Sequence, residues 1–328
     1  MRAPSFLSVR AVLFIAFVAL NAISAAPIPQ SNRSASDRDF NAIGKRTITK
    51  TPNLASLDHE KAMGAQYAAA FESVARRIDD PAVVNYVGRL AGMLAQNSDT
   101  QIPITIRVIN LEIPNAFVLP GGFLYVTSGL ILQMESEGEL AGVLAHGIAH
   151  TALRHGTQTL SRAELANIAG TLGNFPVGPN VLITEYGLIL LGGQPYSIPT
   201  AFLKLQRDDE FDADFFGLQY LYKAGYDPDC FIRFINRMGD PPSSGKKVPR
   251  ELSPIPPAAD RVKAMNKEIA EILPPRATDI ISTADFEAFK DRVRILQSVE
   301  QQLKSLTPNR DAEFETPPFL KRLPPDSH

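Results

Sequence analysis

The stretch 139-ELAGVLAHGIAHTALRHG-156 decides the fold, because apolar residues recur through it at helical spacing. The pattern predicts a helix over 139–154. Two histidines, His146 and His150, stand four residues apart, so they share one face of that helix and both imidazoles can reach one metal ion. A neutral imidazole has a free nitrogen lone pair, which makes it a good zinc ligand. The pair alone is more often two histidines packed in a core than a metal site.

The residue after the first histidine is Gly147. The zinc-protease helix motif His-Glu-x-x-His requires a glutamate at that place as the general base. Metal binding and hydrolysis are therefore separate questions for this chain. A third histidine, His155, lies five residues beyond His150 and is rotated off the shared face, so we expect it to cap or pack the helix end.

A second stretch, 206-QRDDEFDADFFG-217, offers the carboxylates that a metal site needs from another helix. Glu210 and Asp214 are four residues apart and share a helix face. One of them could complete the ligand set while the other orients a histidine. Phenylalanines surround the two acids, which favours partial burial, and a buried carboxylate normally has a partner. The alternative is an acidic helix surface exposed to water.

The length and composition of the chain limit the classes of protein to which it can belong. The chain has 328 residues, 45% of them hydrophobic, with 33 basic and 35 acidic residues. This length allows one or two domains with a substantial core. A nucleic-acid binder would show a basic excess, so we expect no nucleic-acid partner. The single cysteine, Cys230, cannot form an internal disulfide and is expected to be a buried, small apolar residue.

The N-terminus has the pattern of a secretory signal peptide over residues 1–26. Arg2 and Arg10 precede or border the apolar run AVLFIAFVAL (11–20), and small residues follow in 21–26. The apolar run is short for a membrane-spanning helix, which needs about 20 residues. We therefore expect a periplasmic or secreted protein with no stable membrane span after cleavage. The alternative is an uncleaved anchor.

The rest of the chain divides by composition. Residues 27–54, rich in Ser, Arg, Asn, Thr and Pro, are expected to form a flexible lead-in. Residues 55–296 carry the patterns of a folded domain, in which 172–200 is apolar but interrupted by Gly and Pro, as in a packed loop near the site. Residues 297–328 are polar and proline-rich and are expected to be a disordered tail. Periodicity predicts helices over 57–78, 202–223, 258–272 and 285–296, and strands over 102–109, 115–119 and 122–127.

Several short motifs occur in a fixed order along the domain: NAF (115–117), PGG (120–122), E-x-EL (137–140), LAHxIAH (144–150), RHG (154–156), R-x-x-E-x-x-AD (207–214) and GLQYLYKAGYDP (217–228). This order resembles the gluzincin metalloproteases, which include the CAAX prenyl protease, the bacterial heat-shock membrane protease and soluble periplasmic relatives. The resemblance covers roughly residues 55 to 295 and is nearest to the soluble periplasmic type. It implies an α+β fold, a mainly helical metalloprotease domain with a small sheet beside the zinc helix.

The resemblance implies zinc as the cofactor, with His146, His150 and Glu210 as its ligands. Asp214 matches the acid that orients a ligand histidine from the second coordination shell. Arg207 matches an arginine before the third ligand, where an ion pair would position the helix.

The resemblance also implies a polypeptide partner. Asn115, Ala116 and Phe117 match an edge strand of the family that binds an extended or unfolded chain by backbone pairing. We therefore expect a substrate-binding edge at these three residues.

Two departures from the family pattern concern catalysis. Gly147 replaces the glutamate that carries a proton from water to the leaving amine, and such a loss typically costs about 10²–10⁴ in rate. In SPIPPAADR (253–261), Ile255 replaces a histidine that stabilises the oxyanion, and losing one such donor costs about 10²–10³. Glu139 lies two turns, about 10 Å, before His146, and Asp209 points off the Glu210 face, so neither is expected to substitute for the missing base.

No catalytic residue is therefore assigned. We expect an exported protein of the zinc metalloendopeptidase family that acts on unfolded or misassembled envelope polypeptides as a zinc-binding pseudoprotease. The alternatives are a zinc metalloendopeptidase that is still active in envelope protein quality control, and a fold that has also lost its metal.

Overall fold

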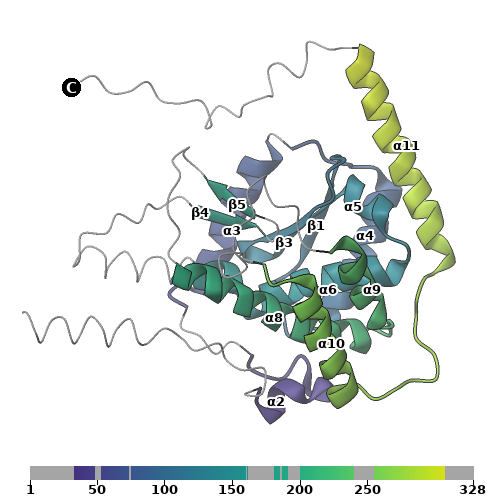
Figure 1. Ribbon diagram of the computed structural model, residues 1–328. Coiled ribbons are helices and arrows are strands. Elements are labelled where there is room, and N and C mark those ends of the chain that lie inside the picture. Colours follow the sequence, from purple (N-terminus) through teal and green to yellow (C-terminus); the bar gives the residue numbers. More distant parts are fainter. Residues whose placement is uncertain are drawn as a thin grey trace, which may run out of the picture.

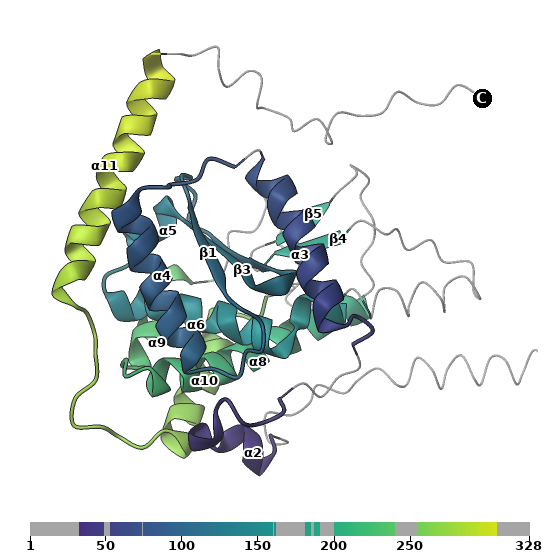
Figure 2. The ribbon, with the colours of Figure 1, turned by 180° about the vertical axis from the view of Figure 1, so that it is seen from behind.

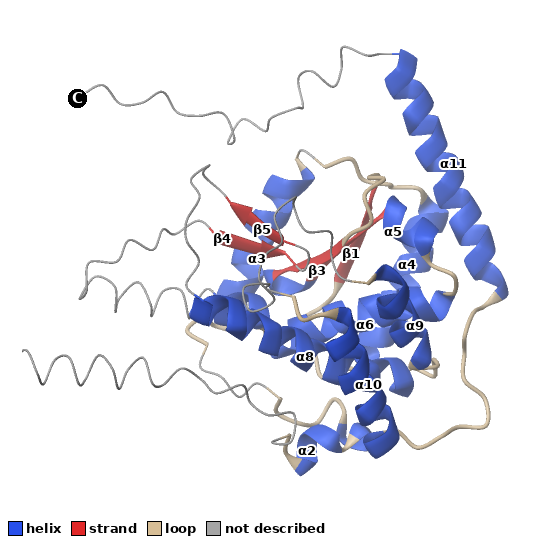
Figure 3. Ribbon diagram, viewed as in Figure 1, coloured by secondary structure: helices blue, strands red, loops and turns tan. Residues whose placement is uncertain are grey.

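The computed structural model describes residues 33–48, 53–73, 75–159, 161, 181–184, 187–190, 200–239 and 255–306. Helices dominate the molecule, and its strands form a small three-stranded sheet and a separate two-stranded pair (Figure 3). This arrangement confirms the expected α+β class. The predicted signal peptide over 1–26 and most of the predicted loop over 172–200 lie outside the described residues.

The helices are α2 (Ala35–Arg38), η2 (Phe40–Ala42), α3 (Leu57–Glu72), α4 (Pro81–Gln96), η3 (Pro120–Gly122), α5 (Ser128–Gln133), α6 (Glu137–Leu153), α8 (Thr200–Lys223), α9 (Asp229–Met238), α10 (Ala258–Ile272) and α11 (Ala284–Leu306). The strands are β1 (Thr105–Ile109), β2 (Ala116–Leu119), β3 (Phe123–Thr127), β4 (Val181–Thr184) and β5 (Gly187–Leu190). Among the described residues, no helix is both long enough and apolar enough to cross a membrane.

The main sheet has three strands in the order β1-β3-β2. The central strand β3 runs parallel to β1 and antiparallel to β2, so that Tyr125 lies opposite Arg107 on one side and Phe117 on the other. Strand β2 is thus an edge of this sheet. Strands β4 and β5 form a separate antiparallel pair, and β4 comes close to β2.

Helix α6 lies at the centre of the domain. All of its side chains are buried except that of His150. Helix α8 packs against it on the side seen in Figure 1, with α10 lying on α8, while α4 and the sheet lie on the opposite side, seen in Figure 2. Ser136 caps its N-terminus by accepting a hydrogen bond from the backbone of Glu139, and Arg154 ends it in a left-handed conformation. The stretch that decides the fold is therefore the core helix on which the other elements pack.

The N-terminal segment 33–48 differs from the expected flexible lead-in. It forms α2 and η2 and inserts Arg46 into the protein, where the guanidinium pairs with Asp99 at 2.8 Å and donates to Gln219 Oε1 at 2.8 Å. Tyr220 donates to the same aspartate at 2.9 Å. The polar composition of residues 33–48 predicts that the segment is exposed to solvent. Instead, a buried arginine with this set of partners fixes the segment to the domain.

The C-terminal helix also differs from expectation. Helix α11 continues to Leu306, so the first ten residues of the predicted disordered tail, 297–306, are helical. Within those ten residues, Gln297 donates to Ser128 Oγ at 2.9 Å and Gln301 donates to Glu112 at 2.7 Å. These contacts to distant parts of the chain account for the added helical turns. The rest of the predicted tail lies outside the described residues.

Candidate metal centre

The close approach of α6 and α8 builds the site. Gly217 on α8 lies against the backbone of His146, and a Cβ atom at position 217 would be 2.9 Å from His146 Cα. Only a glycine allows the two helix backbones to come this near. Glu210 and Asp214 lie on α8 within two turns of Gly217, so the same approach brings their carboxylates to the histidines of α6.

Three side chains converge on one point, as the ligand prediction requires. The Nε2 atoms of His146 and His150 are 3.1 Å apart, and the Glu210 carboxylate oxygens lie 3.5 Å from His146 Nε2 and 3.4 Å from His150 Nε2. A tetrahedral zinc ion with bonds of about 2.0–2.1 Å separates its ligand atoms by roughly 3.3 Å. The three distances fit the edges of such a tetrahedron. In the described part of the chain, His146, His150 and Glu210 are the group of side chains close enough together to hold a metal ion.

The charge state of Glu210 also suits a cation. Burial alone would raise the pKa of this carboxyl, but hydrogen bonds and charge from His146 and His150 outweigh it and hold the pKa well below its usual value. The carboxylate is therefore ionised, as a metal ligand must be.

Asp214 lies behind His146, away from the converging ligand atoms. Its Oδ1 atom is 2.9 Å from His146 Nδ1, and Arg261 on α10 binds both carboxylate oxygens at 2.8 and 2.6 Å. Burial opposes ionisation of Asp214, yet the Arg261 charge lowers its pKa. A carboxylate that holds the non-ligating nitrogen of a histidine is the usual support of a zinc ligand. The contact places Asp214 where this role would need it, and the role itself stays a prediction.

Arg261 is a residue of the site that the sequence does not predict. It is 7% exposed, and a third nitrogen lies 3.8 Å from Glu210. The local pattern of α10 does not distinguish it from a surface arginine. The available signal was charge balance, because two neighbouring buried carboxylates, Glu210 and Asp214, require a nearby cation.

Of the two places expected for His155, capping or packing the helix end, the structure shows packing against the last turn of α6. Helix α6 ends at Leu153, and the imidazole of His155 turns back so that its Nδ1 lies 2.9 Å from His150 Nδ1. It is 6% exposed, and its Nε2 lies 3.8 Å from Asp209. His155 therefore supports the second ligand histidine, a relationship that helical spacing alone does not reveal.

No carboxylate of α6 stands at the position of the family's general base, because Gly147 has no side chain. A Cβ atom there would point at the apolar side chains of Leu124 and Val118 in the sheet. Of the two acids considered as substitutes, Glu139 binds Arg237 and the backbone of Glu135.

The other acid, Asp209, has its Oδ1 atom 3.8 Å from His155 Nε2. Ile255, at the second departure, is half-buried ahead of α10.

The predicted substrate edge uses its side chains for packing. Ala116 and Phe117 are buried, and the Phe117 ring stacks on Tyr125 with centroids 4.9 Å apart. Asn115 precedes β2 and pairs through its backbone with Thr127, donating to its Oγ1 and accepting from its N–H, both at 2.9 Å. Peptide binding at this edge remains a prediction, as does the ion pair expected of half-buried Arg207.

Comparison with known proteins finds relatives among bacterial and mitochondrial proteases. The chain is 30% identical over 244 residues to a putative beta-barrel assembly-enhancing protease of Vibrio cholerae, covering 72% of this chain and 48% of that protein. It is 28% identical over 262 residues to the beta-barrel assembly-enhancing protease of Yersinia pestis, covering 77% and 51%. The mitochondrial metalloendopeptidase OMA1 of Schizosaccharomyces pombe is 27% identical over 244 residues, covering 69% and 66%.

The chain spans about half the length of the beta-barrel assembly-enhancing proteases that it matches. The sequence profile of Peptidase family M48 matches residues 80–269. That range contains α6 and α8, the two helices that carry the candidate metal centre. Since the match spans more than half of the 328 residues and includes both of these helices, the chain belongs to peptidase family M48.

Proposed function

We propose that this protein is an exported, zinc-binding member of its family that holds extended polypeptides and does not hydrolyse them efficiently. The observation that carries the proposal is a contrast within one helix. His146 and His150 point with Glu210 to a common centre at tetrahedral spacing, whereas Gly147, between them, places no proton carrier there.

The residues present fit zinc, because the donor set combines two imidazoles with an ionised carboxylate. Zinc bound there would supply Lewis-acid polarisation of a peptide carbonyl. Hydrolysis also needs a group that takes a proton from the attacking water and returns it to the leaving amine. Leu124 and Val118 line the space beside position 147, and neither can exchange a proton.

The proposed ligand is an unfolded or misassembled polypeptide of the cell envelope. The edge strand β2, preceded by Asn115, would pair with it in extended form. Two of the relatives are named beta-barrel assembly-enhancing protease, and this name supports a polypeptide partner of this kind. The signal-like N-terminus supports a periplasmic or secreted location.

An active zinc metalloendopeptidase is the second candidate, favoured by the complete ligand set and the supporting Asp214. Two measurements on the purified full chain separate the candidates. Elemental analysis should find close to one zinc per chain, and a content below about half would overturn the metal assignment. Labelled casein should show no chelator-sensitive cleavage. Robust cleavage that disappears in His146→Ala would establish the peptidase instead.

A further inference from the structure

We infer that His155 is a positioning residue for the metal ligand His150: its Nδ1 accepts the hydrogen bond from His150 Nδ1–H and thereby holds the opposite nitrogen of His150 toward the metal. The inference rests on the zinc site proposed above. It concerns a residue outside the His-x-x-x-His helix, at the point where the chain has already left α6.

The contact geometry is that of a direct hydrogen bond. The two Nδ1 atoms are 2.9 Å apart, and the rings meet edge to face with centroids 5.0 Å apart at 75°. His155 is 6% exposed, so water does not compete for its inner nitrogen. The two ligand histidines are thus supported by different groups, His146 by the charged Asp214 and His150 by an imidazole.

The chemistry fixes the direction of this bond. A histidine that ligates zinc through Nε2 carries its proton on Nδ1, so His150 is the donor. His155 must then offer a lone pair on Nδ1 and carry its own proton on Nε2. Asp209 lies 3.8 Å from that Nε2, where its negative charge favours the required tautomer.

The backbone conformation of Arg154 turns the chain so that the His155 ring faces His150. Arg154 has φ 61° and ψ 34°, and it is the only non-glycine residue with positive φ in the described ranges. This conformation costs an L-residue free energy and is retained where surrounding contacts enforce it. Here the Arg154 guanidinium donates to the buried Glu60 at 2.7 Å and to Ala55 O at 2.6 Å. Thr157 donates to the same glutamate at 2.9 Å.

A pair of nearly isosteric variants tests the role of the acceptor. In His155→Asn the amide oxygen can take the place of Nδ1, whereas His155→Leu fills a similar volume without an acceptor. Zinc affinity is measured by competition with a chromophoric chelator, and ligand geometry by the visible spectrum of the cobalt-substituted protein. We expect the Leu variant to bind zinc about 10–100-fold more weakly with a changed cobalt spectrum, and the Asn variant to stay close to wild type.

The possible outcomes separate this inference from the proposed function. If the wild-type chain binds no zinc, the proposed site fails and the inference fails with it. If the wild type binds zinc and the Leu variant binds it equally well, only the positioning role is overturned. Equal losses in both variants would also overturn it, because they would report packing.

A measurement on the wild type does not depend on variant folding. Long-range proton–nitrogen NMR of the zinc-loaded protein should show the His155 proton on Nε2. Its presence on Nδ1 would overturn the inference.

Discussion

Gly147 on α6 faces Leu124 on β3 so closely that a Cβ atom at position 147 would lie 2.7 Å from Leu124 Cδ1. The next nearest atom, Val118 Cγ2, would be 3.1 Å away. The helix therefore packs against the sheet at the place where the family's glutamate begins. Because Cδ1 is the free end of a rotatable side chain, Leu124 can turn aside for a larger residue at modest cost.

We expect Gly147→Glu to fold, keep zinc and gain chelator-sensitive hydrolysis of labelled casein, since it supplies a proton carrier next to His146. The gain should be about 10²–10⁴ over the wild-type rate. Gly147→Ala is the matched control, because it adds the same Cβ atom without a carboxylate and should stay inactive. A zinc-loaded Gly147→Glu protein as silent as the Ala variant would contradict the prediction and point to Ile255 as the limiting departure.

Arg261→Met should destabilise the protein strongly. It removes the cation that binds both oxygens of Asp214, which is 2% exposed, and leaves a buried carboxylate uncompensated. Breaking a buried pair in this way costs about 3–5 kcal/mol in the free energy of unfolding, measurable by urea titration.

The double variant Asp214→Asn with Arg261→Met is the control for Arg261→Met. It removes both charges and keeps an acceptor for His146, so it should recover part of the stability. A double variant less stable than Arg261→Met alone would contradict this explanation.

The sequence predicts which side chains meet between α6 and α8 better than it predicts the cation beside them. Four-residue spacing pairs His146 with His150 and Glu210 with Asp214 within their own helices, and the family resemblance joins the two pairs into one predicted site. Arg261 could not be predicted in this way, since it reaches Asp214 from 47 residues away through the packing of α10 on α8. Such contacts depend on tertiary structure, which local periodicity does not record.

The same limit explains the ends of the domain. The predicted core helix and the three strands agree closely with α6, β1, β2 and β3, because each has a strong apolar period. Segment 33–48 is polar by composition, and its structure depends on tertiary contacts, among them the buried pair of Arg46 with Asp99 and the burial of Ile43 in the core. Composition cannot reveal a partner 53 residues away.

Gly217→Ala should weaken both stability and zinc binding. Its Cβ atom would meet the backbone of His146 at 2.9 Å, and a backbone atom cannot turn aside as a side chain can. Separation of α6 from α8 would move Glu210 away from the histidines. We expect a loss of about 1–3 kcal/mol in the free energy of unfolding.

Gly88→Ala is the matched control for Gly217→Ala. It lies on the exposed side of α4 with nothing within 4 Å of its Cβ position, and should stabilise the protein by about 1 kcal/mol. Equal effects of the two substitutions would contradict the close-approach argument.

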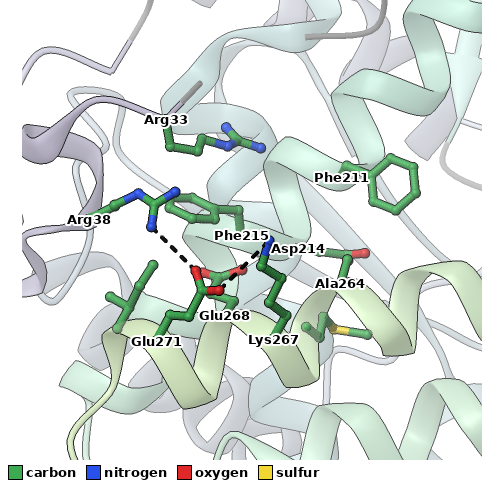
Figure 4. A pocket seen from close by; sticks show the side chains of 11 residues that line it. Arg33, Arg38, Phe211, Asp214, Phe215, Ala264, Lys267, Glu268 and Glu271 are labelled. Carbon is green, nitrogen blue, oxygen red and sulfur yellow. Dashed lines mark hydrogen bonds and ion pairs between the residues drawn. The ribbon is translucent and has the colours of Figure 1, made fainter. Parts of the chain in front are cut away.

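Glu268 on α10 gives a prediction about pH. It is 8% exposed and lines a pocket between α8 and α10, with Asp214 in the pocket wall (Figure 4). Its Oε1 atom is buried without a hydrogen-bond partner among the described residues. Burial raises the pKa of Glu268 well above its usual value, and the nearby Arg33 charge only partly opposes this.

The sign of the pH effect follows from proton counting. As pH rises above about 4.3, the unfolded chain releases the Glu268 proton while the folded protein keeps it, so this group makes the folded state progressively less favourable until its raised pKa is passed. Glu268→Gln is neutral at every pH and escapes this loss. We therefore expect the melting temperature of the variant, relative to wild type, to increase from pH 5 to pH 8. Glu271→Gln, which removes a more exposed carboxylate that pairs with Arg38 and Lys267, is the control. A difference between Glu268→Gln and wild type that stays constant over this range, or that is reproduced by the control, would show that Glu268 is not kept neutral by its burial.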